Sequence, residues 1–339
     1  MSLKRIAEEL GLSLTTVSRA MNGYPEVAAA TRRDVLAAAA RMDYRADVRA
    51  RGLALGRADA VGIVFPITTG DLGDQQFLQV ASSMSERFAQ AGLDLLIVSA
   101  PADDELAAYE RAITGRQIGV FVVPRTRVHD RRLELLQARN VPFVAYGRSA
   151  SFTSAYAWFD FDNMAGARMA TDRLLRLGHR KLGYLGANPE YNFADQRYAG
   201  FCASLKAAGV PLKPMAVQRT ALDRRSGYAA MQKLLALAQR PSAVLVDNNL
   251  AGIGAVHAVL HSGLVLGRDL SVIVYDGLGS DSVVRASVTA VLQPTAIATG
   301  VALAELTLAR LRGEPLESLQ KLCMPELEIG DSDGPPAVS

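Results

Sequence analysis

The sequence predicts a small all-α unit followed by an α/β core of two doubly wound parallel-sheet subdomains. Two observations carry this prediction. Apolar residues recur at helical spacing across residues 3–42, whereas from residue 60 onward short apolar runs alternate with longer stretches of helical period. The strand-like runs fall into two sets, which two similar half-domains explain best. We expect the boundaries to be 1–46 for the helical unit, 47–58 for a linker and 59–339 for the core.

The segment LKRIAEELGLSLTTVSRAMN, which starts at residue 3, has the spacing of two helices that cross at a tight turn. Ile6 and Leu10 share one helical face, and Gly11 can adopt a positive φ at the bend. Ser13 is placed to cap the second helix, and Val17 points back at the first. An ordinary helical hairpin would leave this spacing unexplained. The pattern indicates a helix-turn-helix, the motif that sets its second helix in the major groove of DNA.

In that geometry the first residues of the second helix face base edges and phosphates. The expected DNA contacts are Leu14, Thr15, Thr16, Ser18 and Arg19. The guanidinium of Arg19 suits a bidentate contact to guanine, and threonine side chains suit phosphates or a thymine methyl. Residues 1–57 carry ten Lys/Arg against six Asp/Glu, and the remaining 282 residues carry 27 against 28. Positive charge therefore concentrates at the N-terminus, as phosphate contact requires.

A third helix is predicted by VAAATRRDVLAAAARMDY, with Val35, Leu36, Ala39 and Met42 facing inward. Together, GLSLTTVSRAMNGYPEVAAATRRDVLAAAARMDY resembles the headpiece of the LacI/GalR family of bacterial transcriptional regulators. The likeness includes TVSR in the second helix, the Asn22 that ends it and TR-x-x-V in the third helix. It implies that Leu14 and Thr15 read bases, that Arg19 contacts a base or phosphate, and that Asn22 belongs to the interface.

The linker 47–58 is similar to the hinge helix of the same family. Ala50-Arg51-x-Leu53 matches the hinge motif, and the resemblance implies that Leu53 wedges between base pairs and bends the duplex. The Pro-Asn pair usual in the family is missing, and Gly52 lies inside the helix, where glycine costs roughly 1 kcal/mol relative to alanine. We therefore expect a hinge that becomes helical only on DNA.

Composition excludes several classes of protein. Half of the residues are apolar, yet no run approaches the roughly 18–20 residues that cross a bilayer. A charged helix begins almost at Met1, where a signal peptide would place an apolar stretch. Cys202 and Cys323 form no disulfide framework and no metal motif. We expect a cytoplasmic protein with no membrane partner, no metal and no cofactor.

The core is expected to alternate strands and helices. The predicted strands are 61–65, 93–98, 120–123, 143–146, 181–185, 216–219, 243–246, 271–275, 289–292 and 326–329. The predicted helices include 75–91, 163–177, 194–208, 228–237, 250–260 and 296–311. One subdomain would hold about 59–160 plus part of 290–320, and the other about 163–288 plus the C-terminal strand. This order resembles the periplasmic-binding-protein-like core of the same family, so the likeness covers nearly the whole chain.

Parallel sheets bind ligands beyond the carboxyl ends of their strands, so the polar residues that follow the predicted strands are the candidate site. They are Thr68, Thr69, Arg125, Arg148, Asp247 and Asp276. The resemblance adds Arg197 and Gln293 and matches Asp276 to the family's ligand-holding aspartate. Charged groups beside the aromatic rings of Phe193 and Trp158 suit the hydroxyls and apolar faces of a sugar.

Purely structural roles stay open for these residues. Arg125 and Arg148 also fit paired surface residues, and Trp158 also fits a core position. Gly147 stands where the family often carries aspartate, so the effector class stays open between a sugar and a purine-like or other ligand.

Other functions have weaker support. The sequence shows no dinucleotide or phosphate loop, no nucleophile elbow and no HExxH, so no enzyme is predicted. His257 and His261 share helical spacing but lack a third ligand nearby. A sugar-binding module without a transcriptional role would not need the N-terminal unit, and an architectural DNA-binding protein would not need the core. We predict a homodimeric, ligand-controlled repressor on a palindromic operator, because a dimer doubles the base pairs that are read.

Overall fold

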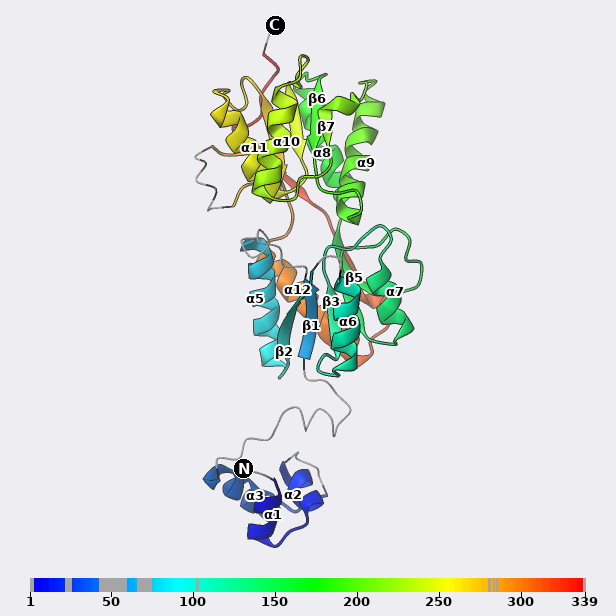
Figure 1. The fold of residues 1–339 in the computed structure, drawn as a ribbon, viewed down its shortest axis with the longest axis vertical. Coiled ribbons are helices and arrows are strands. Elements are labelled where there is room, and N and C mark those ends of the chain that lie inside the picture. Colours follow the sequence, from blue (N-terminus) through cyan, green and yellow to red (C-terminus); the bar gives the residue numbers. More distant parts are fainter. Residues whose placement is uncertain are drawn as a thin grey trace. The chain divides into compact units, whose positions relative to one another are not determined.

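The computed structural model describes residues 3–21, 26–42, 60–65, 75–101, 104–279, 282, 284 and 286–337. The chain divides into two compact units, Met1–Asp59 and Ala60–Ser339 (Figure 1). Each unit has its own hydrophobic core. The predicted hinge residues Ala50, Arg51 and Leu53 lie outside the described residues, as does Asn22.

Three helices pack together in the first unit: α1 (Leu3–Leu10), α2 (Leu14–Met21) and α3 (Ala29–Arg41). Ile6, Val17 and Val35 are fully buried between them. Gly11 has φ +60 at the turn, as predicted, and the hydroxyl of Ser13 accepts a hydrogen bond from the Thr16 amide at 3.0 Å. Together these features make the tight turn between α1 and α2, and they confirm the predicted cap.

One prediction for the third helix was wrong. Leu36 was expected to face inward, but it is 47% exposed. The buried face of α3 is instead formed by Val35, Ala38 and Ala39, because small side chains let the three short helices approach closely.

The first sheet of the core has six strands in the order β11-β5-β4-β3-β1-β2, and every neighbouring pair is parallel. Its strands are β1 (Ala60–Phe65), β2 (Asp94–Ser99), β3 (Val120–Val123), β4 (Phe143–Tyr146), β5 (Ala157–Phe161) and β11 (Gln320–Cys323). Its helices are α5 (Gln75–Gln90), α6 (Glu105–Thr114), α7 (Arg131–Ala138) and α12 (Ala296–Arg312).

Alternation along β1 shows how this sheet is covered. Val61, Ile63 and Phe65 pack with residues of α5 and α12, whereas Val64 packs with residues of α6 and α7. Because successive strand residues point to opposite faces, the two helix pairs cover opposite faces of the sheet (Figure 1). A strand that is buried on both faces needs the continuous apolar run that AVGIVF supplies.

The second sheet has the order β12-β10-β9-β8-β6-β7, and only the β10–β12 pair in it is antiparallel. Its strands are β6 (Leu182–Leu185), β7 (Val217–Gln218), β8 (Ala243–Val246), β9 (Ser271–Tyr275), β10 (Ala290–Leu292) and β12 (Glu326–Glu328). Helices α8 (Asn163–Arg176) and α9 (Asn192–Ala207) cover one face, and α10 (Arg224–Leu235) and α11 (Asn249–His261) cover the other.

The chain passes between the two sheets after β5, after β10 and after β11. These connections leave the carboxyl ends of the central strands of both sheets at the same region of the core. None of the helices in the described part of the chain has the length and apolar character that crossing a bilayer requires.

Candidate functional site

A cavity of about 370 Å³ lies between the two subdomains of the core. Its walls contain the last residue of β1, residues that follow β3 and β4 of the first sheet, and residues that follow β8, β9 and β10 of the second. Six predicted site residues line it: Arg125, Arg148, Phe193, Arg197, Asp276 and Gln293. Thr68 and Thr69 fall outside the described residues.

Arg197 is held at one wall with its side chain almost completely buried, at 5% exposure. Its Nε donates a hydrogen bond to Oδ1 of Asn163 at 2.8 Å, and its Nη1 donates to the backbone carbonyl of Asp247. The guanidinium carbon lies 3.7 Å from the ring centre of Tyr275 and 5.0 Å from that of Phe193. This arrangement fixes a positive charge at the cavity, and stacking against aromatic rings stabilises that charge.

Asp247 was predicted as an effector contact, but it does not line the cavity. Its side chain is fully buried and accepts hydrogen bonds from the Ala187 amide at 3.0 Å and from the Tyr184 hydroxyl at 3.1 Å. Burial raises the pKa of this carboxyl above its ordinary value, and the nearby Arg197 charge opposes the rise. Asp247 therefore stabilises the wall of the cavity without lining it, while its neighbours Asn248 and Asn249 line the cavity.

Asp276 and Gln293 come from adjacent strands of the second sheet. Asp276 follows β9 with φ +61, a left-handed conformation in which a non-glycine residue is uncommon. Gln293 follows β10, and its amide nitrogen is buried with no hydrogen-bond partner within the described part of the chain. A buried unpaired donor is unfavourable unless a ligand or water completes it, so Gln293 marks a place where a polar ligand atom fits.

The opposite wall carries two arginines from the first sheet. The guanidinium carbon of Arg125 lies 4.6 Å from the ring centre of Phe65. Arg148 donates from Nε to Oδ2 of Asp160 at 2.8 Å and lies 5.1 Å from the ring centre of Trp158. Trp158 itself packs against the apolar cluster on the α6 and α7 face and does not line the cavity.

Several cavity residues were not predicted from the sequence. They are mostly amides and aromatic rings: Asn163, Asn192, Asn248, Asn249, Tyr146 and Phe77. Asn163 and Asn192 are the first residues of α8 and α9. A polar residue at the start of a helix that follows a strand was a usable signal, since helix N-termini face ligands in α/β folds.

The predicted DNA-contact residues of α2 are largely accessible. Leu14 is 54% exposed, Thr15 is exposed, and Arg19 lies 3.8 Å from the carboxylate of Glu26 with both side chains about half exposed. Thr16 shares a hydrogen bond of 2.8 Å with the Ser13 hydroxyl, so part of its capacity is used locally. The side chain of Ser18 lies outside the described residues.

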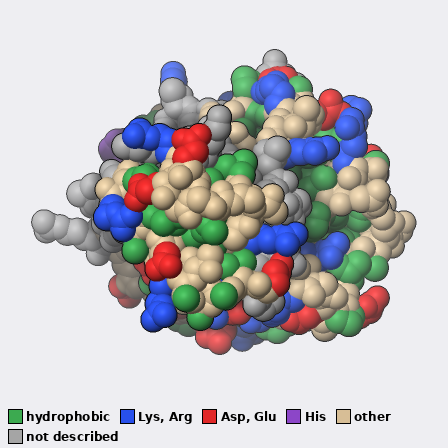
Figure 2. Space-filling view, turned by 90° about the horizontal axis from the view of Figure 1, so that it is seen from below, with side chains coloured by type: hydrophobic (Ala, Val, Ile, Leu, Met, Phe, Trp, Pro, Cys, Tyr) green, Lys and Arg blue, Asp and Glu red, His purple; other side chains and the backbone are tan. Residues whose placement is uncertain are grey.

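Acidic and basic side chains are interspersed, with hydrophobic side chains among them, over the face shown in Figure 2.

His257 and His261 have ring centres 6.0 Å apart, and Nε2 of His257 is 3.0 Å from the carbonyl of Ser282. Across the described ranges, no three His, Cys, Asp or Glu residues are grouped so that they could hold a metal ion.

Comparisons with known proteins match both units. Residues 2–47 match the model for bacterial regulatory proteins of the lacI family, and residues 58–320 match periplasmic binding proteins and the sugar binding domain of the LacI family. The transcriptional regulator RafR of Escherichia coli is 37% identical over 324 residues, which cover 94% of this chain and 95% of that protein.

Two solved structures share the fold over almost the full length. The complex of the transcriptional regulator CelR with cellobiose has a TM-score of 0.73 at 24% identity and covers 98% of this chain and 99% of that one. The lac repressor dimer bound to operator and an anti-inducer has a TM-score of 0.81 at 23% identity, with 98% of both chains covered.

Proposed function

Because this chain belongs to the LacI family of bacterial regulatory proteins, we propose that it is a homodimeric repressor whose affinity for a palindromic operator is set by a small sugar. The chain is a DNA-binding transcriptional regulator; the effector, the dimer and action in the cytoplasm are the proposed parts. The observation that carries the proposal is a cavity with charged and amide side chains on both walls, in a chain that also has a helix-turn-helix.

A sugar suits the chemistry of the cavity. Arg125 and Arg148 offer donors on one wall, and Arg197, Gln293 and Asp276 offer donors and acceptors on the other. Hydroxyl groups act as both donors and acceptors, so a polyhydroxylated ligand can satisfy such a mixed set. The volume of about 370 Å³ falls in the range of roughly 300–1,000 Å³ that is typical of small-molecule sites, and it favours a mono- or disaccharide. The cellobiose bound to the structural neighbour CelR supports this class.

A purine-like ligand is the alternative effector. Purines are held by stacking on an exposed aromatic face. Phe193 already stacks on Tyr191 with ring centres 5.8 Å apart and lies under the guanidinium of Arg197. Phe65 and Phe77 likewise stack on each other at 4.2 Å. Because these rings already contact one another and the arginines, a ligand meets mainly the charged and amide groups of the walls, which suit the hydroxyls of a sugar.

Control of DNA binding requires that the ligand prefer one arrangement of the core. A ligand that bridges Arg125 on one wall and Arg197 on the other binds the closed cleft more tightly than an open one, so it shifts the population toward closure. The three connections between the sheets are the segments that would bend. We propose that closure alters the separation of the two headpieces in the dimer and the folding of residues 47–58, with Leu53 as the wedge.

A ligand screen tests the proposed effector class. Differential scanning fluorimetry of the full-length protein would compare mono- and disaccharides, including cellobiose, with purine bases at equal concentration. A sugar effector is expected to raise the melting temperature in a concentration-dependent way, because it binds only the folded state. Stabilisation by purines and by no sugar would overturn the sugar assignment and leave the regulator role in place.

A further inference from the structure

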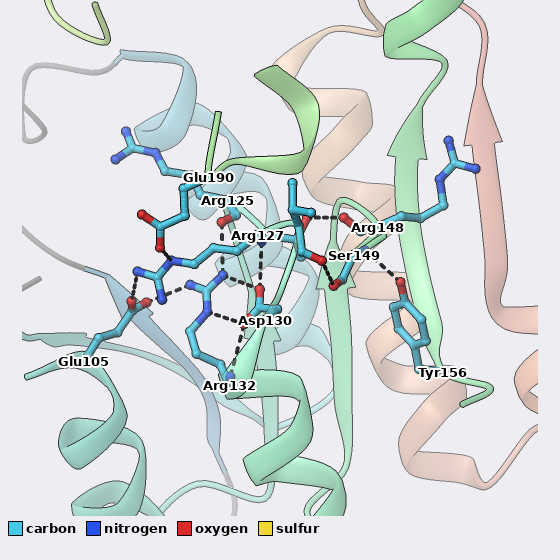
Figure 3. A network of polar contacts seen from close by, with 11 residues as sticks. Glu105, Arg125, Arg127, Asp130, Arg132, Arg148, Ser149, Tyr156 and Glu190 are labelled. Atoms are coloured by element: carbon cyan, nitrogen blue, oxygen red, sulfur yellow. Dashed lines mark hydrogen bonds and ion pairs between the residues drawn. The ribbon is translucent and has the colours of Figure 1, made fainter. Parts of the chain in front are cut away.

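A cluster of buried charged side chains contacts the loop of residues 125–128, which places Arg125 at the cavity (Figure 3). Arg132 is only 2% exposed. Its Nη1 donates to Oε1 of Glu105 at 2.7 Å, and its Nε and Nη2 donate to the two carboxylate oxygens of Asp130 at 2.9 and 2.7 Å. Glu105 and Asp130 are equally buried, at 2% and 1% exposure. Because the removal of one partner would leave a buried charge unpaired, the cluster acts as a unit.

The cluster fixes the backbone of residues 125–128. Nη2 of Arg132 donates to the backbone carbonyl of Arg125 at 3.0 Å, and Oδ2 of Asp130 accepts from the Arg127 amide at 2.9 Å. Arg125 has φ +48, a left-handed conformation that non-glycine residues rarely adopt and that surrounding contacts must enforce. The hydrogen bond from Arg132 therefore holds the turn that directs Arg125 to the cavity.

The same loop reaches the other subdomain through Arg127. Its Nη2 donates to Oε2 of Glu105 at 2.6 Å. Its Nε lies 3.0 Å from Oε1 of Glu190, between β6 and α9 of the second subdomain, in an ion pair that lacks hydrogen-bond geometry. Figure 3 shows Arg127 between the two glutamates.

Backbone hydrogen bonds join the same two segments. The Val128 amide donates to the Glu190 carbonyl at 2.9 Å, and the Asn192 amide donates to the Thr126 carbonyl at 3.0 Å. Asn192 lines the cavity. The four residues 125–128 thus contact both the cavity and the opposite subdomain.

We propose that Glu105, Asp130 and Arg132 form a positioning cluster for Arg125, and that the Arg127–Glu190 ion pair is a latch that favours the closed cleft. Ligand binding at Arg125 and cleft closure at Arg127 are then coupled through four consecutive residues. The positioning half of this inference rests on the proposed function, because it requires a ligand in the cavity. The latch half concerns the free protein as well.

The latch is tested without ligand by hydrogen–deuterium exchange of the full-length protein. Glu190 is 57% exposed, so Glu190→Gln removes the charge without disturbing the buried cluster. The peptides that contain the Val128 and Asn192 amides are expected to exchange about two- to fivefold faster, the range that one partly exposed ion pair supports. The same acceleration should appear in the wild type at high salt, because salt screens the pair.

Glu110→Gln is the matched control. Glu110 is 52% exposed and pairs with Arg139 at 3.1 Å inside the first subdomain, so the same Glu-to-Gln change breaks a surface ion pair away from the latch. Its exchange at Val128 and Asn192 should equal that of the wild type. Equal protection in Glu190→Gln and wild type would overturn the latch.

The positioning role is tested by a double-mutant cycle. Arg132→Lys keeps a positive charge but loses the fork that reaches the Arg125 carbonyl. Calorimetric titration, with cellobiose or the disaccharide that stabilises the wild type most as the probe, should show roughly tenfold weaker binding. If Arg132 acts through Arg125, Arg132→Lys has no further effect on the Kd in an Arg125→Gln background. Additive losses would assign Arg132 a purely structural role.

Failure of the proposed effector class and failure of the latch give different results. If no sugar binds the wild type, the proposed effector class fails, while the exchange experiment still decides the latch. If sugars bind the wild type and Glu190→Gln with equal affinity, and the two proteins also show equal amide protection, the latch fails and the effector site stands.

Discussion

The guanidinium carbon of Arg197 lies 3.7 Å from the centre of the Tyr275 ring, which places a cation from α9 over the last residue of β9. The hydroxyl of Tyr275 donates to the backbone carbonyl of Asn163 at 2.9 Å, and Arg197 donates to the side chain of Asn163. Three elements of the second subdomain, α8, α9 and β9, are thereby joined at one wall of the cavity.

Arg197→Met is expected to weaken binding of the sugar roughly 10- to 100-fold. The loss follows because the variant keeps the buried aliphatic volume but removes a charged donor, and hydrogen bonds to charged groups are among the stronger ones. Isothermal titration calorimetry measures the change. Arg219→Met, which changes an arginine of the same subdomain that does not line the cavity, serves as the control with nearly unchanged affinity. Wild-type affinity in Arg197→Met would remove this residue from the site.

Gly147→Ala is expected to destabilise the core and weaken sugar binding. Gly147 has φ +109, and an added Cβ would lie 2.3 Å from the Thr126 hydroxyl oxygen, within the loop that carries Arg125. Gly209→Ala is a matched control, because Gly209 has φ +64 but no heavy atom within 4 Å of the added Cβ. In urea unfolding, the free energy of unfolding should fall by at least about 1 kcal/mol more in Gly147→Ala than in Gly209→Ala. Equal losses would show that backbone strain alone matters.

Leu14→Ala should weaken operator binding while leaving the headpiece folded. Leu14 is 54% exposed at the start of α2, so its truncation removes little packing in the headpiece. On DNA the variant loses apolar contact with a base edge, at about 0.8 kcal/mol per CH2 group that the contact buries. Anisotropy with labelled operator measures the affinity, and circular dichroism checks the helices. Leu36→Ala changes a leucine of α3 that is 47% exposed and should bind DNA as the wild type does. Equal binding by all three proteins would contradict base contact by Leu14.

His179 predicts a pH dependence of stability. Burial lowers the pKa of His179, although the Gly334 carbonyl and the Asp333 charge oppose the shift. As the pH falls below about 6.5, His179 therefore takes up a proton in the unfolded chain before it does so in the folded protein. The free energy of unfolding that is present above this pH falls until the pH reaches the lower pKa of the folded state. Urea unfolding between pH 7.5 and 5.5 should show this slope, at most about 1.4 kcal/mol per pH unit.

His179→Gln should flatten that slope, whereas the exposed His261→Gln should keep it. His179 also contacts Ser242 at 2.9 Å and Ser271 at 3.1 Å, so the glutamine variant is compared by slope and not by absolute stability. Identical slopes in wild type and His179→Gln would contradict the assignment.

Local pattern predicted the strands that are buried on both faces. Val120–Val123 is a continuous apolar run and Ser271–Tyr275 is apolar after its first residue, and the structure has both strands with the predicted bounds. β5 was missed because Asp160 interrupts its apolar run. β11 was missed because QKLC is a largely exposed edge strand whose pairing with β5 depends on residues far away in the chain.

Local pattern predicted the site where a polar side chain lies one or two residues after its strand. Arg125, Arg148 and Asp276 lie there and line the cavity. Arg197, which lies within α9 and also lines the cavity, was predicted through the family resemblance. Asp247 also follows its strand, yet it turns inward because Tyr184 and the Ala187 amide, about 60 residues earlier in the chain, supply its hydrogen bonds. Asn192 was missed because α9 begins two residues before the predicted start, so its amide side chain joins the cavity. Such tertiary contacts leave no mark in the local sequence.

If a sugar in the core controls operator binding, the affinity of the protein for DNA must change when the sugar binds. The full-length protein would be titrated onto a labelled palindromic operator, selected from random DNA, with and without the sugar that stabilises it in the screen. We expect a change in DNA affinity of about 5- to 150-fold in either direction. At a sugar concentration that saturates only the wild type, Arg197→Met should show no change, and its sugar-free DNA binding should equal that of the wild type. The same operator affinity of the wild type with and without a saturating sugar would contradict control of operator binding by a sugar in the core.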